Sequence, residues 1–272
     1  MKESAESPEV LNWVHLIAKM TEPSSFSEFL MKWEHLIYML IVLSLVALFF
    51  VPLSRNLSLK PGRKQSFAEM LISGLDDVVC GIMGPRGRGY TPFVGSIFIY
   101  ILISNLFGLI PLQNSIMGFI TTTAPIALVV FLYVQWTGIT KNGLKGYLFH
   151  LAGSPENIYG WLLVPLMMPL HIMGEFIKPV SLAFRLFGNI MAGHILLAVF
   201  MMIGISCLKP LHIPIGIPFH VPFLFLEILV SVIQAFVFTL LSTIYIAMML
   251  PHEHSNENHE KHTEAAHEIA AH

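Results

Sequence analysis

Charged residues are scarce in this sequence. Its 272 residues include 15 Lys and Arg and 17 Asp and Glu. Only 12% of the chain is therefore charged, against about 25% in a typical soluble domain. The net charge of −2 lacks the basic excess of a nucleic-acid binder, so we expect no nucleic-acid partner. The chain is also 55% hydrophobic, with a mean hydropathy of +0.70, which predicts an integral membrane protein.

Motifs for catalysis, redox chemistry and metal binding are missing too. Cys80 and Cys207 are far apart and fit neither a redox nor a metal spacing, so we interpret them as small apolar residues. The sequence contains no phosphate-binding loop of the Gly-Lys-Ser/Thr type. A metalloenzyme could use the 13 histidines, but six of them lie in the polar tail from residue 252 on. We expect no enzymatic site, cofactor or metal in this chain.

Long apolar segments predict the fold. The 52 residues from Gly89 to Thr140 carry no formal charge, enough for two helical spans of about 20 residues each. Residues 66–79 have apolar side chains at helical spacing and acidic ones elsewhere, which is typical of an amphipathic helix on the membrane surface. The predicted crossing segments are 36–53, 91–112, 122–139, an apolar stretch broken by Pro165 and Pro169 that leads into a helix around Arg185, and 223–250. The prediction is an all-α membrane protein with about five crossing helices and one surface helix.

The chain divides into three predicted regions: an extension (1–34), a membrane domain (35–250) and a polar His-rich tail (251–272). The N-terminus lacks a basic segment followed by an apolar run, so we expect no removable signal peptide. Eight of the 15 basic residues fall in loops on one side of the predicted spans: Arg55, Lys60, Arg63, Lys64, Arg86, Arg88, Lys141 and Lys145. The positive-inside rule places these loops and the C-terminus in the cytoplasm and the N-terminus outside.

Arg185 is the most informative single residue. The 23 residues that follow it, Leu186 to Leu208, carry no fixed charge, and His194 is their only histidine. A guanidinium is always protonated, and placing one near a bilayer centre costs about 3 kcal/mol. An ionisable residue inside a membrane therefore marks a functional site by default.

Two predicted helices each carry a polar strip. Ser181, Arg185 and Asn189 share one face at i, i+4 and i+8. On the last helix Glu227, Ser231 and Gln234 share a face at i, i+4 and i+7. Such groups can serve as polar contacts between helices, and Arg185 with Glu227 could be a buried ion pair. His194 and Glu227 are instead the kinds of group from which membrane proton relays are built.

These strips carry a family resemblance. KPVSLAFRLFGNIMAGH (178–194) and FLEILVSVIQAFVFTLLSTIYIAMML (225–250) closely resemble subunit a of the F-type ATP synthases. The shared motifs are S-L-x-x-R-L-F-G-N and Q-A-F-x-F-x-x-L-x-x-x-Y, and SNLFGLIPL (104–112) is similar to an element of an earlier helix in that family. The resemblance covers roughly residues 36–250.

The resemblance implies a proton-conducting stator whose last two helices lie tilted against a ring of c subunits. Arg185 then separates two offset half-channels, Asn189 follows it, and Gln234 lies opposite. His194 and Glu227 occupy the positions of a titratable pair in the outer half-channel, a pair that favours H⁺ over Na⁺. Ser181, Glu175 and Lys178 are the candidates for the inner half-channel.

Further partners implied by the resemblance are the b-subunit peripheral stalk, the F1 sector and the lipid bilayer. The implied location is a bacterial inner membrane. The residues alone also allow a stand-alone multi-pass ion transporter. A transporter should show its own substrate cavity, often with inverted repeats, and the sequence has no visible repeat.

Overall fold

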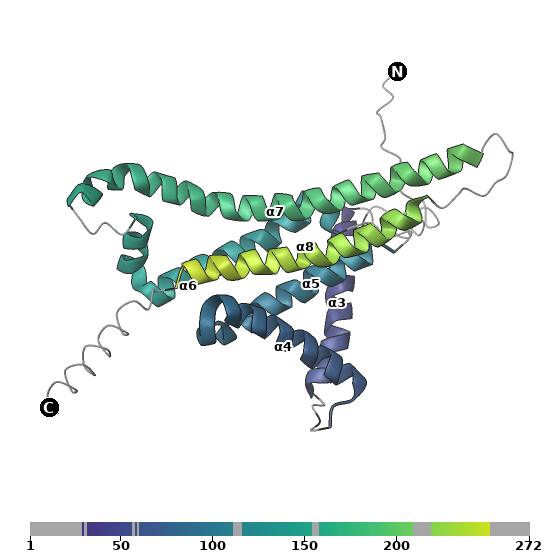
Figure 1. The fold of residues 1–272 in the computed structure, drawn as a ribbon, viewed down its shortest axis with the longest axis horizontal. Coiled ribbons are helices and arrows are strands. Elements are labelled where there is room, and N and C mark those ends of the chain that lie inside the picture. The colour runs from purple at the N-terminus through teal and green to yellow at the C-terminus, as the bar shows by residue number, and fades with distance from the viewer. Residues whose placement is uncertain are drawn as a thin grey trace, which may run out of the picture. The chain divides into compact units, whose positions relative to one another are not determined.

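The computed structural model describes residues 29, 32–55, 58, 60–110, 116–153, 158–208 and 219–250 (Figure 1). All regular secondary structure in these ranges is helical. Five of the helices are long and apolar enough to cross a membrane, which confirms the predicted fold class. The expected N-terminal extension, apart from its last few residues, and the His-rich tail lie outside the described residues.

The helices follow the predicted order along the chain. Their bounds are α3 Glu34–Arg55, α4 Arg63–Met83, η1 Gly84–Gly89, α5 Thr91–Gly108, η2 Ile116–Gly118, α6 Ile120–Leu151, α7 Ile158–Leu208 and α8 His220–Met248. The predicted surface helix is longer than residues 66–79 and forms all of α4. The short 3₁₀ helix η1 follows α4 directly.

Prolines do not divide the long segment before Arg185, contrary to the sequence prediction. Helix α7 runs from Ile158 to Leu208 through Pro165, Pro169 and Pro179. A proline removes one backbone donor, but helices in apolar surroundings tolerate it because neighbouring groups satisfy the freed carbonyl. The break occurs in α6 instead, where Gly143 has a φ of 68°, a left-handed conformation that favours glycine.

The chain forms two compact units. Counting only the described residues, the first contains those up to Phe131 and those of 175–244, and the second contains those of 132–174 and 245–250. In the second unit, Asn142 Nδ2 donates a hydrogen bond to the Met249 carbonyl at 2.7 Å, and Tyr147 OH donates to Gln135 Oε1 at 2.6 Å. The first bond joins α6 to the residue that follows α8, and the second joins the two arms of α6 across the bend at Gly143.

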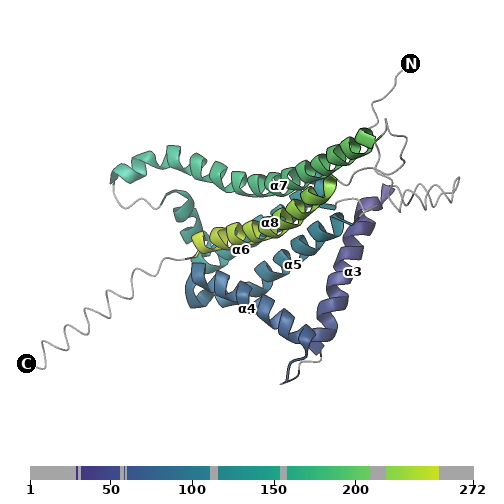
Figure 2. The ribbon, with the colours of Figure 1, turned by 45° about the vertical axis from the view of Figure 1, so that its right-hand side comes forward.

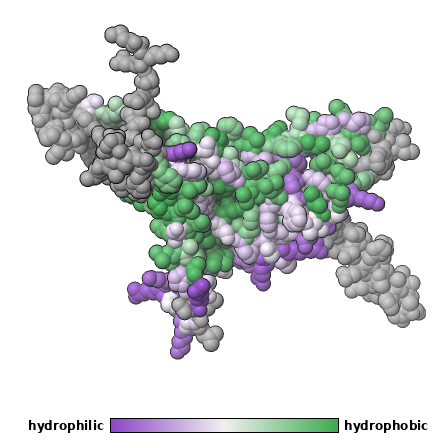
Figure 3. Space-filling model, turned by 180° about the vertical axis from the view of Figure 1, so that it is seen from behind, coloured by the Kyte–Doolittle hydropathy of each residue, from purple (hydrophilic) through white to green (hydrophobic). Residues whose placement is uncertain are grey.

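Within the first unit, α3, α4 and α5 form the sides of a triangle (Figure 2). Helices α3 and α5 pack together where Tyr38 and Val42, both almost fully buried, contact Ile103 and Phe107. Helix α4 packs on the other end of α5, where Leu75 lies beside Gly95. Elsewhere, large apolar side chains point outward, for example Leu48, which is 78% exposed. Hydrophobic residues cover much of the face in Figure 3, as expected of a surface in contact with lipid.

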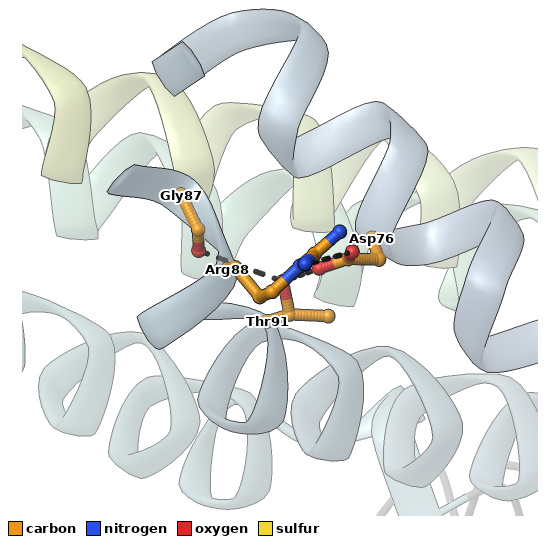
Figure 4. A network of polar contacts seen from close by, with 4 residues as sticks. All are labelled: Asp76, Gly87, Arg88 and Thr91. Carbon is orange, nitrogen blue, oxygen red and sulfur yellow. Dashed lines mark hydrogen bonds and ion pairs between the residues drawn. The ribbon is translucent and has the colours of Figure 1, made fainter. Parts of the chain in front are cut away.

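A polar network fastens α4 to the start of α5 (Figure 4). Thr91 Oγ1 donates to Asp76 Oδ1 at 2.6 Å, and Arg88 Nε donates to Asp76 Oδ2 at 3.2 Å. The Thr91 hydrogen bond, with help from Arg88, holds the pKa of Asp76 below its ordinary value despite an opposing effect of burial. Burial, together with the nearby Asp76 carboxylate, raises the pKa of the Cys80 thiol. The network fixes η1 between the two helices.

Candidate functional site

Helix α8 carries a buried polar face in the first unit. Glu227 is 5% exposed, Ser231 is fully buried and Gln234 is 6% exposed, so the spacing seen in the sequence becomes one inward strip. Val232 and Ile233, between them in sequence, are exposed. The apolar side of α8 therefore faces outward and its polar side faces inward. This is the reverse of a soluble amphipathic helix.

The polar face has a second part further along α8. Thr239, Ser242 and Thr243 are also fully buried. Each hydroxyl donates to the carbonyl four residues earlier, at 2.8 to 2.9 Å. Within the described part of the chain, the carboxylate oxygens of Glu227, the Ser231 hydroxyl and Nε2 of Gln234 have no such hydrogen bonds. Burying a polar group without a partner costs about 1–3 kcal/mol, so these groups need a reason to be there.

Glu227 meets His194 of α7. Glu227 Oε1 lies 3.9 Å from His194 Nε2, and their side chains are 6% and 34% exposed. Figure 1 shows α7 and α8 running side by side in this region. The titratable pair expected from the sequence is therefore in contact, with the acid buried and the imidazole partly accessible.

Gly193 makes that contact possible. A Cβ on Gly193 would lie 2.6 Å from Glu227 Oε1 and 2.9 Å from its Cδ, distances that real Cβ atoms do not show. The absence of a side chain lets the carboxyl group lie directly against the α7 backbone, next to His194.

Helix α5 adds polar groups that the sequence prediction missed. Ser104 is fully buried and Asn105 is 2% exposed. Asn105 Nδ2 donates to the Ser231 carbonyl at 3.4 Å, which links α5 to the polar face of α8. The Asn105 Oδ1 and Ser104 Oγ atoms have no hydrogen-bond partner among the described residues. A Ser-Asn pair in the middle of an uncharged apolar run was the available signal.

Arg185 lies on the opposite, exposed side of α7. Leu182, Leu186 and Ile190 are at most 3% exposed and anchor the helix, whereas Ser181, Arg185 and Gly188 are exposed. Asn189 is half-buried at the edge of this strip. In the part of the chain that the structure describes, Arg185 has no ion pair, with Glu227 or any other residue. The possible static pair between Arg185 and Glu227 is therefore not formed.

Glu175 and Lys178 form an ion pair one turn apart on α7, with side chains 13% and 19% exposed. Glu175 lies ten residues and Lys178 seven residues before Arg185, about 10–15 Å along the helix. In this ion pair each charge is balanced by the other. Among the described residues, no three His, Cys, Asp or Glu side chains come close enough to hold a metal ion.

Comparisons with known proteins agree with the motifs. The sequence profile of the family described as ATP synthase A chain matches residues 36–247. ATP synthase subunit a of Protochlamydia amoebophila is 36% identical over 251 residues, which cover 92% of each chain. The same subunit of Desulfosudis oleivorans is 36% identical over 242 residues, 87% of this chain and 96% of the other. That of Geobacter sulfurreducens is 34% identical over 249 residues, 90% of this chain and 98% of the other. The resemblance drawn from the sequence motifs is confirmed.

Proposed function

Since this chain belongs to the ATP synthase A chain family, whose members are membrane components of the F0 sector, we propose that it is the proton-conducting stator of a rotary ATP synthase. Arg185, exposed and without a partner among the described residues, is the observation that carries the proposal. A permanent positive charge inside a membrane needs a counter-charge. If this chain does not supply one, the carboxylate of a neighbouring c ring can.

Arg185 controls the charge of the ring carboxyl group. A neutral carboxylic acid can face lipid, whereas the adjacent guanidinium stabilises its anionic form. The arriving acid therefore releases its proton to the inner half-channel and passes Arg185 as an anion. It then takes a proton from the outer half-channel and returns to lipid. The same fixed charge repels a proton that would run directly between the two half-channels.

The buried polar groups serve as the outer half-channel. Glu227 and His194 are in contact, and both can accept and release protons. Further polar atoms without partners in the described chain belong to Ser104, Asn105, Ser231 and Gln234, and water can solvate these atoms. Asn105 in addition donates one hydrogen bond to α8. The inner half-channel uses the region of Ser181, Glu175 and Lys178, on the opposite side of Arg185 along α7. Asn189 lies beside the arginine.

The membrane potential sets the electrical energy available to the rotor. Each unit charge that crosses a potential of 100 mV releases about 2.3 kcal/mol, which drives rotation. In this proposal the basic loops lie in the cytoplasm, which puts the N-terminus outside and the C-terminus inside, and the membrane is a bacterial inner membrane. The c ring, the b-subunit stalk and the F1 sector are the protein partners in this proposal. A stand-alone transporter, the alternative from the residues, would not co-purify with a c ring.

Replacing Arg185 tests the proposal. Arg185→Ala should abolish ATP synthesis driven by a proton gradient, because the ring acid then keeps its proton, while the complex still assembles. Arg185→Lys should also fail, because an ammonium group is a point charge that can lose its proton when desolvated. The measurement is ATP synthesis by the purified complex in vesicles. Arg63→Ala, which removes an exposed charge at the start of α4, is the control and should leave synthesis normal. Normal synthesis by Arg185→Ala would refute the proposed role.

A further inference from the structure

A cavity of about 890 Å³ lies between α3, α4 and α5, away from the polar groups of the proposed proton pathway. Its lining residues belong to the three helices that form the triangle in Figure 2 and to η1. This volume is within the range of about 300–1,000 Å³ that holds small ligands in proteins. None of the residues assigned to proton transfer above lines it.

The walls of this cavity, formed by α3 and α5, are mostly apolar, whereas its floor, formed by α4 and η1, carries charged side chains. Leu43, Val46 and Phe50 of α3 and Ile99 of α5 line it with apolar side chains inside the predicted spans. Charged side chains line it on the other side, where α4 and η1 contribute Glu69, Asp76 and Arg88. An apolar depth with charges at the level of an amphipathic surface helix matches the two parts of a phospholipid.

The charges at the floor have free capacity for a ligand. Arg88 uses only Nε for its bond to Asp76, and its side chain is 81% exposed, so its two terminal amino groups can bind a phosphate. Glu69 accepts one hydrogen bond at Oε1, from Gln65, which leaves Oε2 able to accept from an ammonium group. One cation beside two carboxylates fits a headgroup that carries both signs better than an anionic one.

The geometry favours a lipid over a helix of another protein. At one end α3 and α5 close on each other through Tyr38 and Val42, and at the other end α4 lies across the space. A partner helix that spans the membrane would have to pass through α4. Leu43 and Ile72 line the cavity and are 55% and 48% exposed, so the cavity opens sideways between α3 and α4. A lipid can enter by that route from the bilayer.

We propose that this cavity binds a zwitterionic phospholipid with an ammonium headgroup, whose phosphate contacts Arg88, whose ammonium contacts Glu69 and whose acyl chain lies against α3 and α5. The lipid fills the space between the three helices that form the triangle. It thereby supports the position of α4 on the membrane surface. This inference does not depend on the proposed proton pathway.

Photo-crosslinking tests the proposal in the whole complex. p-Benzoylphenylalanine replaces Ile72 in one variant and Val46 in another, and the complex is placed in vesicles with equal amounts of phosphatidylethanolamine and phosphatidylglycerol. After irradiation, mass spectrometry of the subunit should show phosphatidylethanolamine adducts. Arg88→Gln should lower their yield about tenfold, the size of one charge-assisted hydrogen bond, whereas Arg86→Gln on the same turn should not.

A filling substitution provides a second readout if Arg88→Gln disturbs η1. Ser73→Trp places a large side chain in the cavity and should remove the adduct at Val46. Met70→Trp, on α4 but outside the cavity lining, should leave it unchanged. Adducts with a polypeptide, equal or preferred labelling of phosphatidylglycerol, no lipid adduct at either position, or equal loss in the control variants would each overturn the proposal.

Discussion

The two halves of the buried polar face of α8 differ in where their hydrogen bonds go. Thr239, Ser242 and Thr243 donate to carbonyls of their own helix and need nothing from outside it. Glu227 and Gln234, earlier on the same face, are 5% and 6% exposed but keep side-chain atoms without partners in the described chain. Burial of a polar side chain in a membrane helix does not therefore indicate transport by itself. What distinguishes the proposed proton pathway is unused hydrogen-bonding capacity next to a titratable neighbour.

Removing the carboxyl group of Glu227, in the first half of the polar face of α8, should have the largest effect on ATP synthesis. Glu227→Gln keeps the shape of the side chain but cannot carry a proton, so proton-driven ATP synthesis should fall about 100-fold while assembly is unaffected. Proton uptake into vesicles and ATP synthesis measure the change. Thr239→Val, a substitution of similar size in the second half, is the matched control and should retain synthesis. Unchanged proton flux in Glu227→Gln would remove the distinction between the halves.

Moving the acid without removing it should have a smaller effect. Gly193→Ala places a methyl group 2.6 Å from the present position of Glu227 Oε1, so the carboxyl group must leave its place beside His194. We expect about a tenfold loss of proton flux, within the range for a misplaced proton-transfer group. Gly174→Ala on the same helix, where nothing lies within 4 Å of the added carbon, controls for the change in helix propensity. Equal proton flux in the two variants would show that the Gly193 contact is not needed.

The link from α5 should matter less again. Asn105→Leu removes the donor to the Ser231 carbonyl and one unpaired oxygen from the polar region. We expect about a fivefold reduction in proton flux, the equivalent of one hydrogen bond. The pH dependence of proton uptake should keep its shape, because no titratable group is lost. A loss as large as that in Glu227→Gln would show that Asn105 acts directly in proton transfer.

The smallest effect belongs to the second half of the face. Ser242→Ala removes a hydroxyl that bonds only to the Phe238 carbonyl, which the helix already uses. ATP synthesis should stay within about twofold of the unsubstituted complex. A loss of tenfold or more would mean that the proton pathway extends along the whole polar face of α8. The comparison between its halves would then fail.

Helical periodicity predicted the faces but not the partners. The i, i+4 and i+7 spacing was enough to place Glu227, Ser231 and Gln234 on one strip, because helix geometry fixes which residues share a side. Nothing in that spacing indicates that Asn105, 126 residues before Ser231, lies against it. The prolines led to a wrong prediction. Pro165 and Pro169 predicted a break by local propensity, but in α7 the surroundings outweigh that propensity.

Arg185 shows most clearly what the sequence reveals and what only the structure reveals. Its isolation from other charges was visible in the sequence, and its exposed position on α7 was not. The most direct measurement is a structure of the assembled complex in a membrane that shows this side chain and its surroundings. The account predicts the guanidinium within about 4–6 Å of a c-ring carboxylate, close enough to stabilise the anion. A guanidinium that faces lipid, or that pairs with Glu227 of its own chain, would contradict it.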